Sequence, residues 1–150
     1  MEIICIGFKG ERNSSYQVVS RFSGDKLFLT NSVAGLTREI EALEKPYRAA
    51  ILFGLDKRLG NGVRIEKSAV GDGEYLSSAL DLTGLSEVLR RGGGNAEIGN
   101  APFPCLCNEA YRLALRKYGG NAVFIHLPSI RRLMEERIGA IVSAVEGYFL

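Results

Sequence analysis

The sequence has little of what metal sites and disulfide-rich folds require, with one histidine and three cysteines in 150 residues. Three cysteines make no disulfide framework, and two neighbouring cysteines with a single histidine fall short of the four ligands of a structural zinc site. No run approaches the roughly 18 apolar residues of a membrane span. The start of the chain lacks the basic lead and small-residue cleavage site of a secretory signal. We therefore expect a cytoplasmic protein with no metal or cofactor and no membrane partner.

The sequence also lacks the charge pattern of a nucleic-acid-binding protein. Its formal net charge is +2, and no cluster of lysine and arginine alternates with aromatic residues. Neither a GxGxxG nor a P-loop pattern is present, so the glycines at 92–94 and 119–120 are interpreted as helix ends. With 46% hydrophobic and 24% charged residues, the composition is that of a globular protein, and we expect residues 1–150 to form a single domain.

Apolar runs alternate with segments of helical periodicity, which is typical of an α/β fold with a mainly parallel sheet. The predicted strands are residues 3–7, 26–29, 49–53, 63–70, 96–98 and 122–126. The predicted helices are residues 15–22, 32–43, 83–91, 107–118 and 129–149, the last with Met134 on its apolar face. In such sheets reactive groups gather at the carboxyl ends of strands, and the reactive candidates are expected to converge on one edge.

Cys107 and His126 are the residues most able to carry chemistry. Cys107 opens a predicted helix, where the backbone amides and the helix dipole favour a thiolate and lower the pKa of a thiol. His126 ends a predicted strand and is the only imidazole that could serve the thiol as a base. Taken separately, each has an ordinary structural explanation: Cys107 as a small buried side chain, and His126 as a hydrogen-bonded residue at a strand end.

Glu66 is the best candidate for a third group that orients the imidazole and stabilises its protonated form. It lies within the predicted strand 63–70. Strict alternation there would place Arg64, Glu66 and Ser68 together on a solvent-exposed face, and periodicity alone favours that simpler interpretation. The choice between the two stays open on spacing alone.

Four segments of the chain resemble the pyrrolidone carboxyl peptidases, also called pyroglutamyl peptidase I, a family of cysteine peptidases. Residues 6–8 and 13–15 resemble the glycine–phenylalanine and helix entry that follow the family's first strand. Residues 54–70 resemble the segment that carries the family's catalytic glutamate. Residues 100–108 resemble its nucleophile segment, and residues 124–128, Phe-Ile-His-Leu-Pro, resemble its histidine segment.

The resemblance implies a three-layer α/β/α sandwich of the phosphorylase/hydrolase type, with a mainly parallel mixed sheet. It implies Cys107 as nucleophile, His126 as acid and base, and Glu66 as the orienting carboxylate of a peptidase that removes an N-terminal pyroglutamyl group through a thioester. Peptides or small amides would be the substrates, no cofactor would be needed, and a homo-oligomer would fit the family. The residues expected to bind the substrate or the oxyanion are Arg58, Gly7, Phe8 and Leu106.

The chain also departs from this family and is interpreted as a shortened member. Residues 71–74 replace a long loop after Val70, and residues 9–12 replace the second aromatic residue of the family's pocket loop. Cys105 stands where the family has an apolar, often aromatic, side chain, and we expect Cys105→Ser to leave most activity intact. Two alternatives therefore stay open: a related cysteine amidase or deacylase for another acyl group, and a non-catalytic relative that binds a small ligand or a partner.

Overall fold

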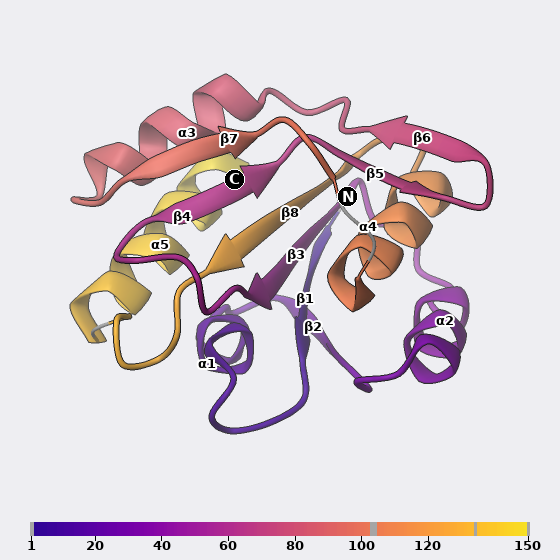
Figure 1. Cartoon of the computed structure of the whole chain (residues 1–150), viewed down its shortest axis with the longest axis horizontal. Helices are drawn as coiled ribbons and strands as arrows, with labels where there is room; N and C mark the ends of the chain where they lie inside the picture. Colours follow the sequence, from indigo (N-terminus) through magenta and orange to yellow (C-terminus); the bar gives the residue numbers. More distant parts are fainter. Residues whose placement is uncertain (1, 103–104, 134, 150) are drawn as a thin grey trace.

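The computed structural model describes residues 2–102, 105–133 and 135–149, and over these ranges the chain forms a three-layer α/β/α sandwich (Figure 1). Phe103 and Pro104 of the predicted nucleophile segment and Met134 of the last predicted helix lie outside the described residues. The strands are β1 (Ile3–Phe8), β2 (Asp25–Leu29), β3 (Ala49–Leu55), β4 (Val63–Glu66), β5 (Ser68–Gly71), β6 (Glu74–Ser77), β7 (Ala96–Gly99) and β8 (Ala122–Leu127). The helices are α1 (Ser14–Ser20), α2 (Val33–Glu41), α3 (Leu82–Arg91), α4 (Leu106–Lys117) and α5 (Glu135–Phe149).

The described strands of the main sheet run in the order β2-β1-β3-β8-β4-β7. Strands β1, β2, β3 and β8 are parallel, whereas β4 is antiparallel to β8 and parallel to β7. Strands β5 and β6 form a separate antiparallel pair that packs on α4. The predicted α/β fold with a mainly parallel mixed sheet is confirmed.

The two faces of the sheet bury different sets of helices because successive strand residues point to opposite sides. In β1, Cys5 joins the core beneath α1, α3 and α5, while Ile4 and Ile6 join the core beneath α2 and α4. In β8 the same alternation sends Val123, Ile125 and Leu127 to the first core. The remaining side chains of β8 therefore face α4, and these include His126.

The predicted strand 63–70 is wrong in one respect, because it is divided at Lys67 between the two sheets. The backbone N–H of Lys67 donates to Gly99 of β7 at 3.4 Å, whereas its carbonyl accepts from Ser78 beyond β6 at 2.9 Å. This residue thus turns the chain from the main sheet into the small one. Strand β6 was not predicted, since residues 74–77 have weak apolar alternation and only Glu74 and Leu76 are half-buried.

All five predicted helix starts differ from the structure, four of them by one residue, and two of the differences bear on the argument. Helix α4 begins at Leu106, one residue before the predicted start, with Cys105 as its N-cap. The predicted helix 129–149 is helical only from Glu135, and Ser129 instead begins a turn in which its carbonyl accepts from Arg132 and Leu133. Within the described ranges, no helix is long and apolar enough to cross a membrane.

Candidate active site

A small cavity lies between the start of α4 and the sheet face that α4 covers. Its volume is about 20 Å³, enough for about one water molecule. The described residues that line it are Glu66, Ser68, Pro102, Cys105, Cys107, Asn108, Tyr111, Phe124 and His126. The three residues predicted as a catalytic triad thus meet at one cavity, on a face of the sheet and not along one edge of it. The reason is that β4 and β7 run against β8, so their carboxyl ends do not share its edge.

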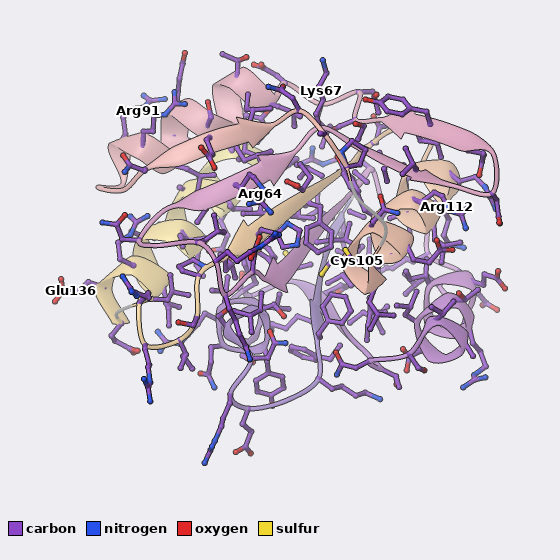
Figure 2. All side chains as sticks on the ribbon, viewed as in Figure 1. Arg64, Lys67, Arg91, Cys105, Arg112 and Glu136 are labelled. Carbon is purple, nitrogen blue, oxygen red and sulfur yellow. The ribbon has the colours of Figure 1, made fainter. Side chains whose placement is uncertain are left out.

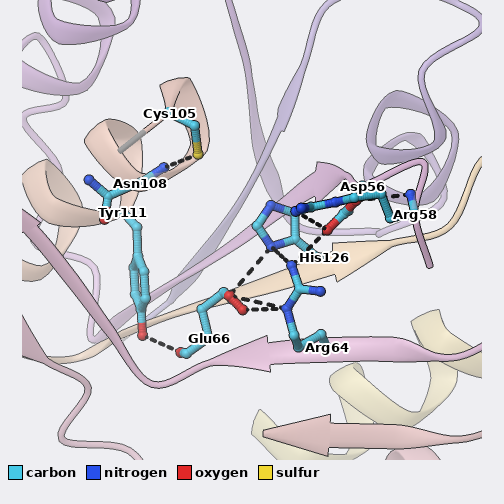
Figure 3. Close-up of polar contacts among 8 residues, drawn as sticks. All are labelled: Asp56, Arg58, Arg64, Glu66, Cys105, Asn108, Tyr111 and His126. Atoms are coloured by element: carbon cyan, nitrogen blue, oxygen red, sulfur yellow. Dashed lines mark hydrogen bonds and ion pairs between the residues drawn. The ribbon is translucent and has the colours of Figure 1, made fainter. Parts of the chain in front are cut away.

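The antiparallel pairing of β4 with β8 brings Glu66 to His126. Arg64 is the register partner of His126, and Glu66 is the partner of Phe124, so all four side chains belong to adjacent strands. Oε2 of Glu66 lies 3.7 Å from Nδ1 of His126, an ion-pair distance when the imidazole is protonated (Figure 3). Burial by itself raises the pKa of Glu66, but the contacts with His126 and Arg64 outweigh burial and hold that pKa below its ordinary value.

Arg64 links this pair to a second carboxylate, Asp56, which follows β3. Nε of Arg64 donates to Glu66 Oε1 at 2.7 Å, and Nη2 donates to Asp56 Oδ2 at 2.8 Å. Nη2 also lies 3.5 Å from Nδ1 of His126. Nδ1 without a proton can accept a hydrogen bond from Arg64, whereas Nδ1 with a proton can donate to Glu66. Sequence reasoning assigned no role in the site to Arg64 or Asp56, although for Asp56 a charged residue directly after the buried strand β3 was a usable signal.

Cys107 is the second residue of α4, and its sulfur packs against the sheet at Gly54. An added Cβ at Gly54 would lie 2.8 Å from Cys107 Sγ and 2.6 Å from Phe124 Cζ. Gly54 is also the register partner of His126. Glycine at this position therefore allows the sulfur to approach β3 and β8 closely, which a larger residue would prevent.

Cys105, not Cys107, occupies the N-cap of α4. Its backbone is extended, and its sulfur accepts a hydrogen bond from the Asn108 amide at 3.4 Å. Figure 2 shows Cys105 where α4 begins. Cys105 and Cys107 line the same cavity.

The two thiols have opposite pKa shifts because each acts on the other. The neighbouring Cys107 thiol, with the amides of Asn108 and Cys107 and the charge of His126, outweighs burial and lowers the pKa of Cys105 to about 6. The neighbouring Cys105 and burial raise the pKa of Cys107 above its ordinary value. The expected low pKa at Cys107 is thus wrong for the resting pair, since the cap position belongs to its neighbour.

Asn108 fastens α4 to β5, and Tyr111 fastens it to the end of β4, where Glu66 lies. The amide side chain of Asn108 accepts from the Val70 N–H at 3.0 Å and donates to the Val70 carbonyl at 2.6 Å. The Tyr111 hydroxyl donates to the backbone carbonyl of Glu66 at 2.7 Å (Figure 3). Both residues fix the distance between the start of α4 and the end of β4, and hence the shape of the cavity.

The other predicted site residues lie apart from this cavity, and none is among the described residues that line it. Arg58 is largely exposed and forms an ion pair with Asp56 at 3.1 Å. Gly7 faces α1, because an added Cβ would meet the Ser15 carbonyl oxygen at 2.9 Å. Phe8 is buried in the core beneath α2 and α4, and Leu106 packs against that same core.

Comparison with known proteins finds no matching family model and no matching curated sequence. Among solved structures, the chain is similar to pyrrolidone carboxyl peptidase from Thermococcus litoralis, with a TM-score of 0.77, 22% identity, and 97% of this chain and 91% of that chain covered. A variant of the Pyrococcus furiosus enzyme gives a TM-score of 0.82 at 20% identity, with both chains fully covered. The Thermus thermophilus enzyme gives 0.79 at 19% identity, covering 99% of this chain and 100% of that chain. The chain therefore has the fold of the pyrrolidone carboxyl peptidases, as the sequence motifs predicted.

Proposed function

We propose that this chain, which has the fold of the pyrrolidone carboxyl peptidases, is a cysteine peptidase that removes an N-terminal pyroglutamyl group from peptides or small amides. The observation that carries the proposal is the meeting of Cys107, His126 and Glu66 at one cavity of that fold. The free cysteines suit a reducing compartment. We accordingly place the reaction in the cytoplasm, with the whole chain acting as one domain.

The positions of Cys107, His126 and Glu66 suit one role each in the reaction. Cys107 gives its proton to His126 and attacks the carbonyl carbon of the pyroglutamyl group, and His126 then passes that proton to the departing amine. Glu66 stabilises the imidazolium through its contact with Nδ1. Water then hydrolyses the thioester, with His126 as the base. Amides in the first turn of α4 are suited to bind the oxyanion, and losing one such donor typically costs about 3–4 kcal/mol of transition-state stabilisation.

Arg58 has a more distant part in this scheme than the sequence suggested. The Arg58 guanidinium forms an ion pair with Asp56 and also interacts electrostatically with Cys105. Arg58 therefore contributes to the positive potential around the thiols and is not assigned a direct contact with the oxyanion. Gly7, Phe8 and Leu106 have structural roles. Gly7 packs closely against α1, Phe8 is part of the core beneath α2 and α4, and Leu106 packs against that core.

A second candidate function is hydrolysis of an amide that carries another acyl group. The cavity has room for about one water molecule, so a five-membered lactam can enter only after the cavity walls move apart. Phe8, the aromatic residue expected to contact the lactam, is buried in the core. A smaller acyl group would need less rearrangement, and this observation favours the alternative.

A fluorogenic pyroglutamyl amide tests the proposal, with acetyl and prolyl amides of the same fluorophore as competitors. We expect turnover of the pyroglutamyl amide by the wild type and its loss in Cys107→Ser. Cys5→Ser is the matched control, because Cys5 is buried on the opposite face of the sheet and should leave turnover unchanged. Turnover of only the acetyl amide would replace the proposed substrate, and no turnover of any amide would contradict a hydrolase.

A further inference from the structure

Arg64 lies between two carboxylates at the site, and the reaction proposed above assigns it no part. Its Nε donates to Glu66 Oε1 at 2.7 Å, and its Nη2 donates to Asp56 Oδ2 at 2.8 Å. The side chains of Arg64, Asp56 and Glu66 are only 19%, 8% and 14% exposed. Figure 3 shows the guanidinium between these two carboxylates and beside the His126 ring. A triad needs only the carboxylate of Glu66, so the arginine requires an explanation of its own.

Glu66 borders two different spaces. It lines the small cavity together with Cys107 and His126. It also lines an open pocket of about 440 Å³, and the described residues around that pocket are Arg58, Arg64, Glu66, Gly99, Asn100 and Ala101. A glutamate side chain rotates about three bonds, so the backbone of β4 alone does not decide which space the carboxylate faces.

The hydrogen bond from Arg64 is what holds the carboxylate on the His126 side. Nε of Arg64 is 2.7 Å from Oε1 and 3.4 Å from Oε2, so Oε1 is the oxygen that it binds. Oε2 is the oxygen that lies 3.7 Å from Nδ1 of His126. Gly99, the register partner of Glu66 in β7, leaves room for this arrangement, because an added Cβ would lie 2.6 Å from Oε1 and 3.2 Å from Arg64 Cδ.

Asp56 fixes Arg64 relative to the strand that carries His126. The backbone N–H of Asp56 donates at 2.9 Å to the carbonyl of Leu127, the residue directly after His126. Oδ1 of Asp56 accepts from the backbone N–H two residues further on at 3.0 Å, and Oδ2 accepts from Arg64. The contacts therefore run from the main chain of β8 through Asp56 and Arg64 to Glu66, which faces back toward His126.

We propose that Arg64, anchored by Asp56, is a positioning residue that keeps Glu66 turned toward Nδ1 of His126. This inference rests on the proposed function and adds to it a residue that acts through Glu66. With Glu66 in place, Nδ1 carries the ring proton of the neutral imidazole, and Nε2 is left to take the proton of Cys107. Without Arg64, Glu66 is free to turn into the open pocket, where water solvates its charge.

The alternative role for Arg64 is to neutralise two mostly buried carboxylates and nothing more. Arg64→Met removes the charge and both hydrogen bonds but keeps an unbranched side chain. Arg64→Lys keeps a positive charge but lacks the planar fork whose Nε and Nη2 reach the two carboxylates separately. Lysine should therefore replace a neutralising arginine without loss of activity, and it should not replace a positioning one.

Turnover of the pyroglutamyl amide by paired variants separates these two roles. We expect Arg64→Met to lower kcat by about tenfold, with KM changed by less than about twofold, because a displaced catalytic group lowers the rate of the chemical step. In a Glu66→Ala background the same substitution should change kcat by less than about twofold, since no carboxylate remains for Arg64 to direct. Equal losses of kcat in the two backgrounds would overturn the proposal.

Two further variants complete this comparison. Arg64→Lys should keep the urea midpoint of the wild type but remain at least about threefold below its kcat, and full kcat in this variant would also overturn the proposal. If Arg64→Met does not fold, Arg64→Lys takes its place in both backgrounds. Arg90→Met is the matched control, because it removes a guanidinium that donates to the Ala96 carbonyl at 2.9 Å from α3, and it should leave kcat unchanged.

Nitrogen-15 NMR of the imidazole tests the position of the ring proton without any substrate. The chain has one histidine, so its ring signals belong to His126. With the ring neutral, we expect the chemical shifts to place the proton on Nδ1 in the wild type and to show a mixture of the two tautomers in Arg64→Met. A wild-type proton on Nε2 would refute the proposal, because Nδ1 would then accept from Arg64 and would not face Glu66 as a donor.

The two measurements fail separately. If the wild type turns over no pyroglutamyl amide but its ring proton lies on Nδ1 and leaves it in Arg64→Met, the pyroglutamyl substrate is wrong and the positioning of Glu66 by Arg64 is supported. If the wild type is active but Arg64→Met changes neither the tautomer nor kcat, the proposed function stands and the role of Arg64 is refuted.

Discussion

Gly54→Ala should lower activity strongly with little structural change elsewhere, because the sulfur of Cys107 packs directly against Gly54. The new methyl group would lie 2.8 Å from Cys107 Sγ and within 2.8 Å of two ring carbons of Phe124. Comfortable carbon contacts are about 3.5–4.0 Å. The sulfur must therefore retreat by roughly 1 Å, since Gly54 is in a central strand and cannot move away.

Two quantities follow from that displacement. Overpacking of a core costs about 1–3 kcal/mol of unfolding free energy, and we expect a value near 2 kcal/mol in a urea titration. A shift of about 1 Å in a reacting group can lower the rate by about 100-fold, so kcat for the pyroglutamyl amide should fall by that order. The fall in kcat should persist at temperatures where the variant is fully folded.

Gly139→Ala is the matched control for this substitution. Gly139 is exposed within α5, and an added Cβ would have no heavy atom within 4 Å. Alanine there should stabilise the helix by roughly 0.5–1 kcal/mol and leave kcat unchanged. If Gly54→Ala retains full activity and stability, the sulfur does not rest against β3 and the geometry given for the site is wrong.

Three further substitutions test the polar network. Glu66→Gln removes the charge beside His126 but keeps the shape, so kcat should fall by about 10- to 100-fold while KM changes little, as measured by initial rates. Asp56→Asn leaves Arg64 with one carboxylate, and we expect the protein to lose about 3 kcal/mol of unfolding free energy at pH 7. The pKa of Asp56 is lowered in the folded protein, so its contribution is present above the ordinary value of 3.8 and is lost as the pH falls below it. The difference between wild type and Asp56→Asn should thus shrink in urea titrations between pH 5 and about 3, and a constant difference would contradict the ion pair. Asn108→Ala leaves both backbone groups of Val70 unpaired and should cost about 2–3 kcal/mol, whereas Asn108→Asp, which keeps one acceptor, should cost less.

Elements with strong local signals were predictable from the sequence. The strands with continuous apolar runs and the capped helices all form within about two residues of the predicted bounds, as with Asn13 at α1 and Ser32 at α2. The failures fall where neighbours far away in the chain decide the structure. Lys67 leaves one sheet for another only because Gly99 and Ser78 supply its backbone partners.

The site shows the same division between local and distant causes. A thiol near a helix start and an imidazole at a strand end are local patterns, and both predicted positions lie at the cavity. The antiparallel course of β4 is a property of the whole sheet, and it alone decides that Glu66 faces His126 and does not face solvent. Periodicity could not have made that choice, because Arg64 and Glu66 share a face in either case.

The difference between Cys105 and Cys107 follows from the residue at which α4 begins. A helix that began at Asn108 would place Cys107 at the N-cap, nearest to the first amides. Because α4 begins at Leu106, the cap position and its amide hydrogen bond belong to Cys105, and the sulfur of Cys107 packs against Gly54. A boundary of one or two residues, which sequence patterns do not resolve, thus decides which of the two thiols caps the helix.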